Sequence, residues 1–251
     1  MPAVPAWPPA STPRLFVDQT LSADALIRIG GAQAHYLSGV MRLGAGDPVR
    51  LFDDVSGEWL AEVAEVSKRE LVLRITAHLQ PREPVPDVWL LAAPIKKGRI
   101  DLVAEKACEL GVARLQPVIT RRTVVDRLNL DRLRAHMIEA AEQCGRTALP
   151  ELAEPARLGA CLRAWPAERA LIFADETGGP AMREAVRPGP AAILIGPEGG
   201  FAPEEREAIR AVPQAIGVSL GPRILRAETA AIAALSVWMA IVGDWSQNKT
   251  G

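Results

Sequence analysis

The sequence predicts a two-part α/β protein, in which a small β-barrel precedes a mostly parallel sheet with helices on both sides. Three observations lead to this prediction. Short alternating segments separated by turn residues fill most of the first eighty positions. Continuous apolar segments alternate with helical ones from residue 87 onward. The segment 81–86 holds three prolines and lies between the two patterns, which predicts a linker.

The β-barrel domain is expected to span residues 13–80. Its expected strands are 15–17, 48–52, 59–66 and 70–77, and one helix is expected at 32–41. Glycine and aspartate residues between the strands supply turn signals. Five prolines lie within the first thirteen residues, so residues 1–12 are expected to form a flexible, extended leader. This leader lacks the basic and apolar regions of a secretory signal peptide.

The parallel-sheet domain is expected to span residues 87–246. Its expected strands are 88–93, 115–119, 170–174, 191–195 and 215–220, and its expected helices are 100–110, 130–144, 203–211 and 227–242. The last helix is nearly all apolar, but it carries Glu228 and falls short of the about 20 residues that a membrane span needs. It is therefore expected to be buried within the protein, without a membrane partner.

The charge of the chain is balanced overall but unevenly spread. There are 29 Lys and Arg against 30 Asp and Glu, a net charge of −1. This balance is typical of a soluble globular protein and excludes a nucleic-acid binder that acts through overall positive charge. Residues 94–134, however, hold 10 basic and 5 acidic side chains. Such a local basic stretch favours one structured RNA site over indiscriminate binding to polyanions.

Cysteine and histidine residues give no sign of a metal centre. The three cysteines and the three histidines are scattered, and none has the spacing of a zinc or redox motif. No metal is therefore expected. An odd number of cysteines without a pairing pattern is typical of reduced thiols in the cytoplasm.

Two segments of unusual composition follow predicted strands, where ligands bind in a parallel sheet. The segment 195–201 reads Ile-Gly-Pro-Glu-Gly-Gly-Phe, and its glycines allow the backbone to approach a ligand closely. The segment 219–229 holds two arginines, a carboxylate and two hydroxyl groups. Each segment alone could equally be a tight turn or a set of surface ion pairs. The absence of the dinucleotide, P-loop and nucleophile-elbow motifs argues against an oxidoreductase, an NTPase and a hydrolase of those types.

Together the two segments resemble the 16S ribosomal RNA uracil-N3 methyltransferase family (RsmE-type) of the SPOUT superfamily. The resemblance covers about residues 13–245 and includes the segments 13–17, 35–43, 96–112 and 139–146. Two departures, Cys144 and Ala202, each replace a hydroxyl that the family pattern leads us to expect. The change at Ala202 should weaken the start of the following helix by about 1 kcal/mol.

The resemblance implies a deep trefoil knot in the second domain and a PUA-like fold for the barrel. It implies S-adenosyl-L-methionine as cofactor and 16S rRNA of the 30S ribosomal subunit as partner. It also implies a homodimer, with the last helix contributing to the interface.

The resemblance also implies a set of site residues. Arg226 would stabilise negative charge on the uracil carbonyl groups, and Glu228 or Glu198 would accept the N3 proton. The residues expected to hold the cofactor are Phe173, Ala174, Gly196, Pro197, Glu198, Gly199, Gly200, Val218, Leu220, Gly221, Ile224, Leu225 and Thr229. The residues expected to contact RNA are Arg14, Arg42, Lys96, Lys97, Arg99, Arg121, Arg122 and Arg146, although several could equally be solvated helix-face charges.

Three alternatives remain open at this point. The chain could be a SPOUT-type methyltransferase with another RNA target. It could be a noncatalytic RNA-binding or ribosome-assembly module, which would keep the basic stretch and need no cofactor. It could also be a small-molecule α/β enzyme that uses the glycine segment, which would not need the barrel.

Overall fold

The computed structural model describes residues 12–67, 69–96, 98–125 and 127–246. The chain divides into two compact units. The N-terminal unit comprises the described residues up to Pro84 together with Ala141–Ala148. The C-terminal unit comprises the described residues of Val85–Ala140 and those from Leu149 onward.

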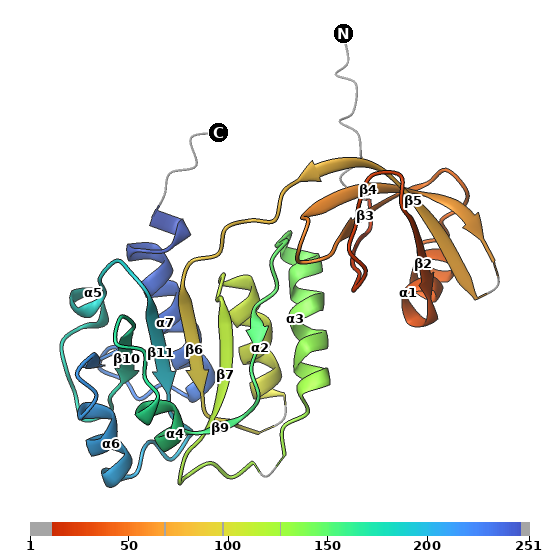
Figure 1. Ribbon diagram of the computed structural model, residues 1–251. Helices are drawn as coiled ribbons and strands as arrows, with labels where there is room; N and C mark the ends of the chain where they lie inside the picture. Colours follow the sequence, from red (N-terminus) through yellow and green to blue (C-terminus); the bar gives the residue numbers. More distant parts are fainter. Residues whose placement is uncertain (1–11, 68, 97, 126, 247–251) are drawn as a thin grey trace. The chain divides into compact units, whose positions relative to one another are not determined.

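The N-terminal unit is a curled five-stranded sheet with one helical segment. Its elements are β1 (Arg14–Phe16), β2 (Leu26–Gly30), α1 (Gly31–His35), the π-helical turn η1 (Tyr36–Val40), β3 (Pro48–Phe52), β4 (Glu58–Val66) and β5 (Glu70–Gln80). The strand order is β1-β3-β4-β5-β2, so β1 and β2 form the two edges (Figure 1). The pair β1–β3 is parallel and the other three pairs are antiparallel.

Alternation of apolar and polar residues explains the core of this unit. In β2, Ile27 and Ile29 are buried while Arg28 between them is exposed. The same face collects Leu51, Leu71 and other apolar side chains from β3, β4 and β5. This strand was not among those predicted, although its short alternating pattern is visible in the sequence.

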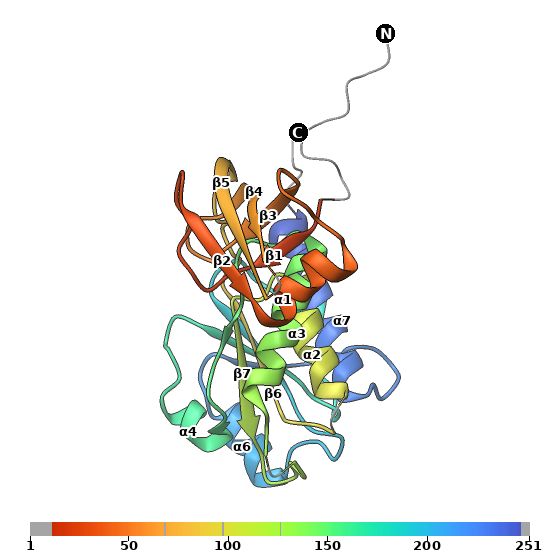
Figure 2. The ribbon, with the colours of Figure 1, turned by 90° about the vertical axis from the view of Figure 1, so that its right-hand side faces the viewer.

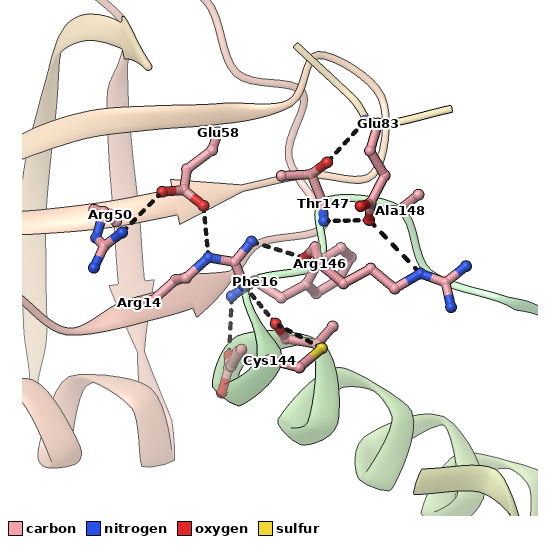
Figure 3. Close-up of polar contacts among 11 residues, drawn as sticks. Arg14, Phe16, Arg50, Glu58, Glu83, Cys144, Arg146, Thr147 and Ala148 are labelled. Carbon is pink, nitrogen blue, oxygen red and sulfur yellow. Dashed lines mark hydrogen bonds and ion pairs between the residues drawn. The ribbon is translucent and has the colours of Figure 1, made fainter. Parts of the chain in front are cut away.

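The end of α3 (Leu130–Cys144) and the residues that follow it belong to the N-terminal unit, where Arg14 contacts them (Figure 3). Nη1 of Arg14 donates to the carbonyl oxygen of Ala141 at 2.6 Å, and Nη2 donates to that of Arg146 at 2.7 Å. The partial negative charge at the C-terminus of a helix favours a cation at this place. Arg14 therefore fixes the last turn of α3 within the unit.

Glu83 holds the same segment from another direction (Figure 3). Its Oε1 accepts hydrogen bonds from the backbone N–H groups of Thr147 at 2.8 Å and Ala148 at 3.2 Å. Its own backbone N–H donates to Oγ1 of Thr147 at 2.9 Å, and Nε of Arg146 lies 3.7 Å from Oε1. The segment is thus tied to the N-terminal unit by several independent hydrogen bonds.

The C-terminal unit is a parallel sheet. Its strands are β6 (Val88–Ala92), β7 (Arg114–Ile119), β8 (Glu151–Leu152), β9 (Ala156–Arg157), β10 (Ala170–Ala174), β11 (Ala191–Ile195) and β12 (Ala215–Val218). The order is β12-β10-β11-β6-β7-β8, with β9 paired to β7, and every pair is parallel (Figure 1). Each residue of β11 is buried, as expected for a central strand covered on both faces.

Helices lie on both faces of this sheet. They are α2 (Arg99–Glu109), α3, α4 (Leu158–Arg163), α5 (Met182–Ala185), α6 (Pro203–Arg210), α7 (Ala227–Ile241) and the 3₁₀ turn η2 (Asp244–Ser246). The view along the sheet shows α2 and α7 on one side of β6 and β7 and α4 and α6 on the other (Figure 2). Leu158 of α4 and Ile209 of α6 share a core cluster with Phe173 of β10.

The predicted strands and helices of this unit are present, with shifts of one or two residues at their ends. The largest shift is in β12, which ends at Val218 instead of Leu220. The sequence did not predict β8, β9, α4 or α5, which have two to six residues each. Elements this short carry too few residues to display a period.

Candidate active site

A pocket of about 350 Å³ lies where three neighbouring strands of the parallel sheet end. Residues from three connections line it. These connections are residues 174–178 after β10, a glycine loop (196–200) after β11, and a second loop (219–226) after β12. Arg206 of α6 and Ala227 and Ala230 of α7 also contribute. The pocket therefore occupies the position at which parallel sheets bind their ligands.

The glycine loop is a tight turn. The backbone N–H of Gly200 donates to the carbonyl oxygen of Pro197 at 2.8 Å, and Gly200 has a φ of +67°. A side chain disfavours this left-handed conformation, which explains a glycine here. A Cβ atom on Gly200 would also lie 2.8 Å from Oε1 of Glu176. Phe201 packs against Gly196 and closes the loop at its far end.

Asp175 organises the connection after β10. Its carboxylate is buried and accepts hydrogen bonds from the backbone N–H of Thr177 at 3.0 Å, from Oγ1 of Thr177 at 2.7 Å, and from Nη2 of Arg210. Burial acts to raise the pKa of Asp175, but these hydrogen bonds outweigh it and hold the pKa below its ordinary value. The carboxylate is therefore charged at neutral pH and anchors the connection to α6.

The second loop is held at its start and exposed beyond it. The backbone N–H of Ser219 donates to the carbonyl oxygen of Pro180 at 2.9 Å, which joins the loop to the connection after β10. Ile224 is 93% exposed although it lines the pocket. Arg226 is the N-cap residue of α7, and its backbone carbonyl accepts the N–H of Ala230 at 2.8 Å. Its side chain is exposed.

Two carboxylates and one arginine meet beside the pocket. Glu228, in the first turn of α7, is buried, and its Oε1 lies 3.6 Å from Nε of Arg99. Glu198, on the glycine loop, is exposed, and its Oε1 lies 3.8 Å from Nη1 of the same arginine. Oε2 of Glu228 is buried and has no hydrogen-bond partner among the described residues. Arg99 thus lies between a buried and an exposed carboxylate.

The structure brings most of the predicted cofactor residues together. Those that line the pocket are Ala174, Gly196, Pro197, Glu198, Gly200, Val218, Leu220, Gly221, Ile224 and Leu225. Phe173 lies in the hydrophobic core instead, Gly199 contacts Arg122, and Thr229 is exposed on α7. Arg226 and Glu228 are neighbours of lining residues and do not line the pocket themselves.

Several lining residues were absent from the predicted cofactor set. They include Glu176, Thr177, Gly178 and Arg206. The first three closely follow β10, so their place after a strand was the signal that could have identified them. Arg206 lies within α6 and is brought to the pocket by the fold alone.

The predicted RNA-contact residues have different surroundings. Arg14 and Arg146 are buried, with side chains 7% and 5% exposed, so little of either guanidinium group is left for RNA. Arg42 is exposed and has a φ of +58°, and Lys96 is exposed. Arg99 pairs with the two carboxylates described above. Lys97 lies outside the described residues.

Arg121 and Arg122 contact the protein itself. Nη1 of Arg121 donates to Oε2 of Glu204 at 2.9 Å, and its backbone N–H donates to Oε1 of Glu205 at 2.8 Å. Nη1 of Arg122 donates to the carbonyl oxygen of Gly199 at 2.6 Å. Arg121 therefore holds the start of α6, and Arg122 holds the glycine loop.

Within the residues that the structure describes, no group of three or more His, Cys, Asp or Glu side chains is arranged to hold a metal ion. None of the helices in the described part of the chain is long and apolar enough to cross a membrane.

Comparison with known proteins places the chain in a family. The model of an RNA methyltransferase domain matches residues 81–239, and that of an RNA methyltransferase PUA domain matches residues 29–76. A ribosomal RNA small subunit methyltransferase E from Synechocystis is 32% identical over 232 residues, covering 89% of this chain and 76% of the relative. The chain belongs to the ribosomal RNA small subunit methyltransferase E family. Another family member, from Rickettsia conorii, is 29% identical and covers 89% of this chain and 93% of its own.

Solved structures agree with this family. A methyltransferase from Legionella pneumophila, in complex with S-adenosylmethionine, is 32% identical with a TM-score of 0.84, covering 94% of this chain and 100% of its own. Methyltransferase E from Neisseria gonorrhoeae, bound to S-adenosylmethionine, is 26% identical with a TM-score of 0.85, covering 93% and 99%. The N-terminal unit is accordingly a PUA-like domain, and the C-terminal unit is an RNA methyltransferase domain.

Proposed function

We propose that this protein transfers a methyl group from S-adenosyl-L-methionine to N3 of a uridine in 16S rRNA, in the cytoplasm. The observation that carries the proposal is the pocket at the ends of β10, β11 and β12, which is built from the glycine loop and the second loop. These two loops hold the motifs that resemble the family. The solved relatives that contain S-adenosylmethionine support the choice of cofactor.

The residues of the pocket fit this cofactor. A volume of about 350 Å³ lies in the range of pockets that bind small molecules. Ala174, Leu220 and Leu225 supply apolar surface suited to an adenine ring, and Gly196 and Gly200 have no side chain to keep a ligand away from the backbone. Glu176 and Glu198 place negative charge in the lining, which suits a cationic ligand. When bound, the cofactor supplies a methyl group made electrophilic by a positively charged sulfur.

The proton on N3 of uracil must leave before this nitrogen becomes a good nucleophile, and Glu228 is our candidate to accept it. Its Oε2 atom is buried without a hydrogen-bond partner in the described part of the chain, so it can receive a donor that the substrate brings. Nε of Arg99 lies 3.6 Å from Oε1, the other oxygen of the same carboxylate. Glu198 is the second candidate, because it lines the pocket.

Arg226 is our candidate to balance the negative charge that develops on the uracil carbonyl oxygens as the proton leaves. It stands at the N-cap of α7, where the partial positive charge of the helix end adds to that of the guanidinium group. Its backbone is fixed by the first hydrogen bond of the helix, while its side chain is free to reach a base. Electrostatic stabilisation of this kind is often the largest contribution to a catalysed step.

We also propose contacts of this protein with rRNA and with a second copy of the chain. We propose that exposed arginine and lysine side chains, including Arg42 and Lys96, contact the rRNA. A homodimer formed through α7 and the exposed Trp245 beyond it would cover the end of this apolar helix. The trefoil knot stays a prediction, as does the flexible leader at 1–12, of which residues 1–11 lie outside the described residues.

Calorimetry with S-adenosyl-L-methionine and the purified protein tests the cofactor assignment first. The proposal expects one saturable site per chain. It expects the Arg226→Ala variant to keep this binding and to lose methyl transfer, because Arg226 does not line the pocket. A wild-type protein that does not bind the cofactor would support the noncatalytic RNA-binding alternative.

A further inference from the structure

We propose that Arg122 is a positioning residue for the cofactor: it fixes the glycine loop (196–200) in the geometry that the pocket requires. This inference rests on the function proposed above. Arg122 belongs to the turn 120–123 between β7 and α3, and it lies 77 residues before Gly199 in the chain. It does not line the pocket, so it acts through the loop.

Two kinds of contact join Arg122 to the loop. Its Nη1 atom donates to the carbonyl oxygen of Gly199 at 2.6 Å. Its aliphatic stem lies along the same residue, because a Cβ atom on Gly199 would be 3.4 Å from Cδ and 3.6 Å from Cβ of Arg122. The arginine thus covers the face of Gly199 while its charged end holds the peptide carbonyl. A hydrogen bond from a charged donor to a carbonyl is stronger than a neutral one.

The neighbouring residue of the loop is held from a different connection. Oε1 of Glu176 lies so close to Gly200 that a Cβ atom there would be only 2.8 Å away. Glu176 is fixed in turn by Nη2 of Arg206 at 2.8 Å. Two consecutive residues of the loop therefore contact charged side chains from other connections: Gly199 contacts Arg122, and Gly200 contacts Glu176. Glu176, Gly200 and Arg206 line the pocket, so this geometry determines its shape.

The turn that carries Arg122 is itself held by hydrogen bonds. The backbone N–H of Thr120 donates to Oγ1 of Thr123 at 2.9 Å, and the two threonine hydroxyls are also 2.9 Å apart. Arg121 binds Glu204 and Glu205 in the first turn of α6. Oε2 of Glu205 also accepts the N–H of Ala202, directly after the glycine loop. The turn 120–123 is therefore attached both to the loop and to the helix that follows it.

The positioning role of Arg122 and the RNA contact predicted from the basic stretch have different consequences that can be measured. An arginine that binds phosphate would affect RNA affinity and its salt dependence, whereas Arg122 as a brace of the glycine loop would affect cofactor affinity without RNA. Loss of the contact would leave the loop with more conformations in the free protein, and binding would have to restrict them.

The test uses Arg122→Met, which keeps the stem on Gly199 and removes the donor, and Arg122→Lys, which restores one. Arg127→Ala is the matched control, since Arg127 is an exposed arginine of the same basic stretch. Titration calorimetry of each full-length variant with S-adenosyl-L-methionine, in the absence of RNA, gives the dissociation constant. Thermal unfolding in parallel reports whether each variant folds.

We expect Arg122→Met to weaken cofactor binding roughly tenfold, at the lower end for a lost hydrogen bond to a charged group. Arg122→Lys should recover most of this loss, and Arg127→Ala should match the wild type. Binding of 30S particles should keep the same salt dependence in Arg122→Met. The inference is overturned if a folded Arg122→Met variant binds the cofactor with an unchanged dissociation constant. It is also overturned if the only effect of the substitution is a smaller salt dependence of particle binding. A wild-type protein that fails to bind the cofactor would instead refute the proposed function.

Discussion

Arg14 and Glu58 form a buried ion pair in the N-terminal unit, with Nε and Oε2 2.6 Å apart and side chains 7% and 4% exposed (Figure 3). The same guanidinium group lies over the ring of Phe52 at 3.9 Å from its centroid. With its bonds to the carbonyl groups of Ala141 and Arg146, it uses all three of its nitrogen atoms. Arg14 is therefore a central structural residue of the unit.

We expect Arg14→Ala to destabilise the protein by about 3–5 kcal/mol, because among the described residues it leaves the buried Glu58 carboxylate with only its contact to Arg50, at 3.4 Å. Urea unfolding measured by circular dichroism gives this free energy. The control is Arg28→Ala, which removes a pair with Glu70 whose side chains are 69% and 40% exposed, and should cost less than about 1 kcal/mol. Equal costs for the two variants would contradict the account.

Asp175 should make stability depend on pH in the acid range. Its pKa in the folded protein is below the ordinary value of 3.8, so the folded state binds the proton less readily than the unfolded state. The resulting stabilisation is fully present above the unfolded-state pKa and is lost as the pH falls through the folded-state pKa. Asp175→Asn should therefore destabilise the protein at pH 7, by about 2 kcal/mol for its charged hydrogen bonds.

Urea unfolding of wild type and Asp175→Asn at pH 7 and at several values below pH 4 checks this prediction. The difference in unfolding free energy between the two proteins should shrink as the pH decreases. If the difference in unfolding free energy stays constant down to the lowest pH, the charge of Asp175 does not contribute to stability.

Gly179 allows the connection after β10 to approach β12. A Cβ atom at this position would lie 2.4 Å from the carbonyl oxygen of Gly217, a backbone atom that cannot move away easily. Gly179→Ala should therefore destabilise the protein by about 1–3 kcal/mol and weaken cofactor binding, because residues 174–178 line the pocket. Gly159→Ala, within helix α4, should leave both unchanged or raise stability slightly. Thermal unfolding and calorimetry compare the two variants.

Amide substitutions can show which of the two carboxylates beside Arg99 accepts the proton. Glu228→Gln keeps the shape of the side chain and removes its ability to accept a proton, so turnover should fall by about 10²–10⁴-fold. Glu198→Gln should have a smaller effect, because Glu198 is exposed and its pairing with Arg99 is longer. Single-turnover methyl transfer at saturating cofactor measures both. The reverse order of effects would assign the proton to Glu198.

Periodicity was sufficient to predict the main elements of the C-terminal unit, whereas β2 of the N-terminal unit was missed. The apolar run in β11 and the helical spacing in α2 and α3 are local patterns, and the structure has these elements at nearly the predicted residues. The two residues of β8 and of β9 are strands only because β7 lies beside them, a long-range fact that no local pattern contains.

The site could be predicted where its residues follow strands, as in the glycine loop and the second loop. The partners of individual charges could not. Four arginines were predicted to contact RNA but bind acceptors within the protein: Arg14, Arg121, Arg122 and Arg146. Those acceptors are often backbone carbonyl groups, which every residue has and which the sequence therefore cannot distinguish.

The most direct test of the account is methyl transfer from labelled S-adenosyl-L-methionine to purified 30S particles, followed by mapping of the modified base. We expect a single methylated uridine in 16S rRNA, modified at N3, with the wild-type protein. We expect no methylated uridine with Arg226→Ala, although that variant should still bind the cofactor. Methylation at another atom or in another RNA, or full activity of Arg226→Ala, would contradict it.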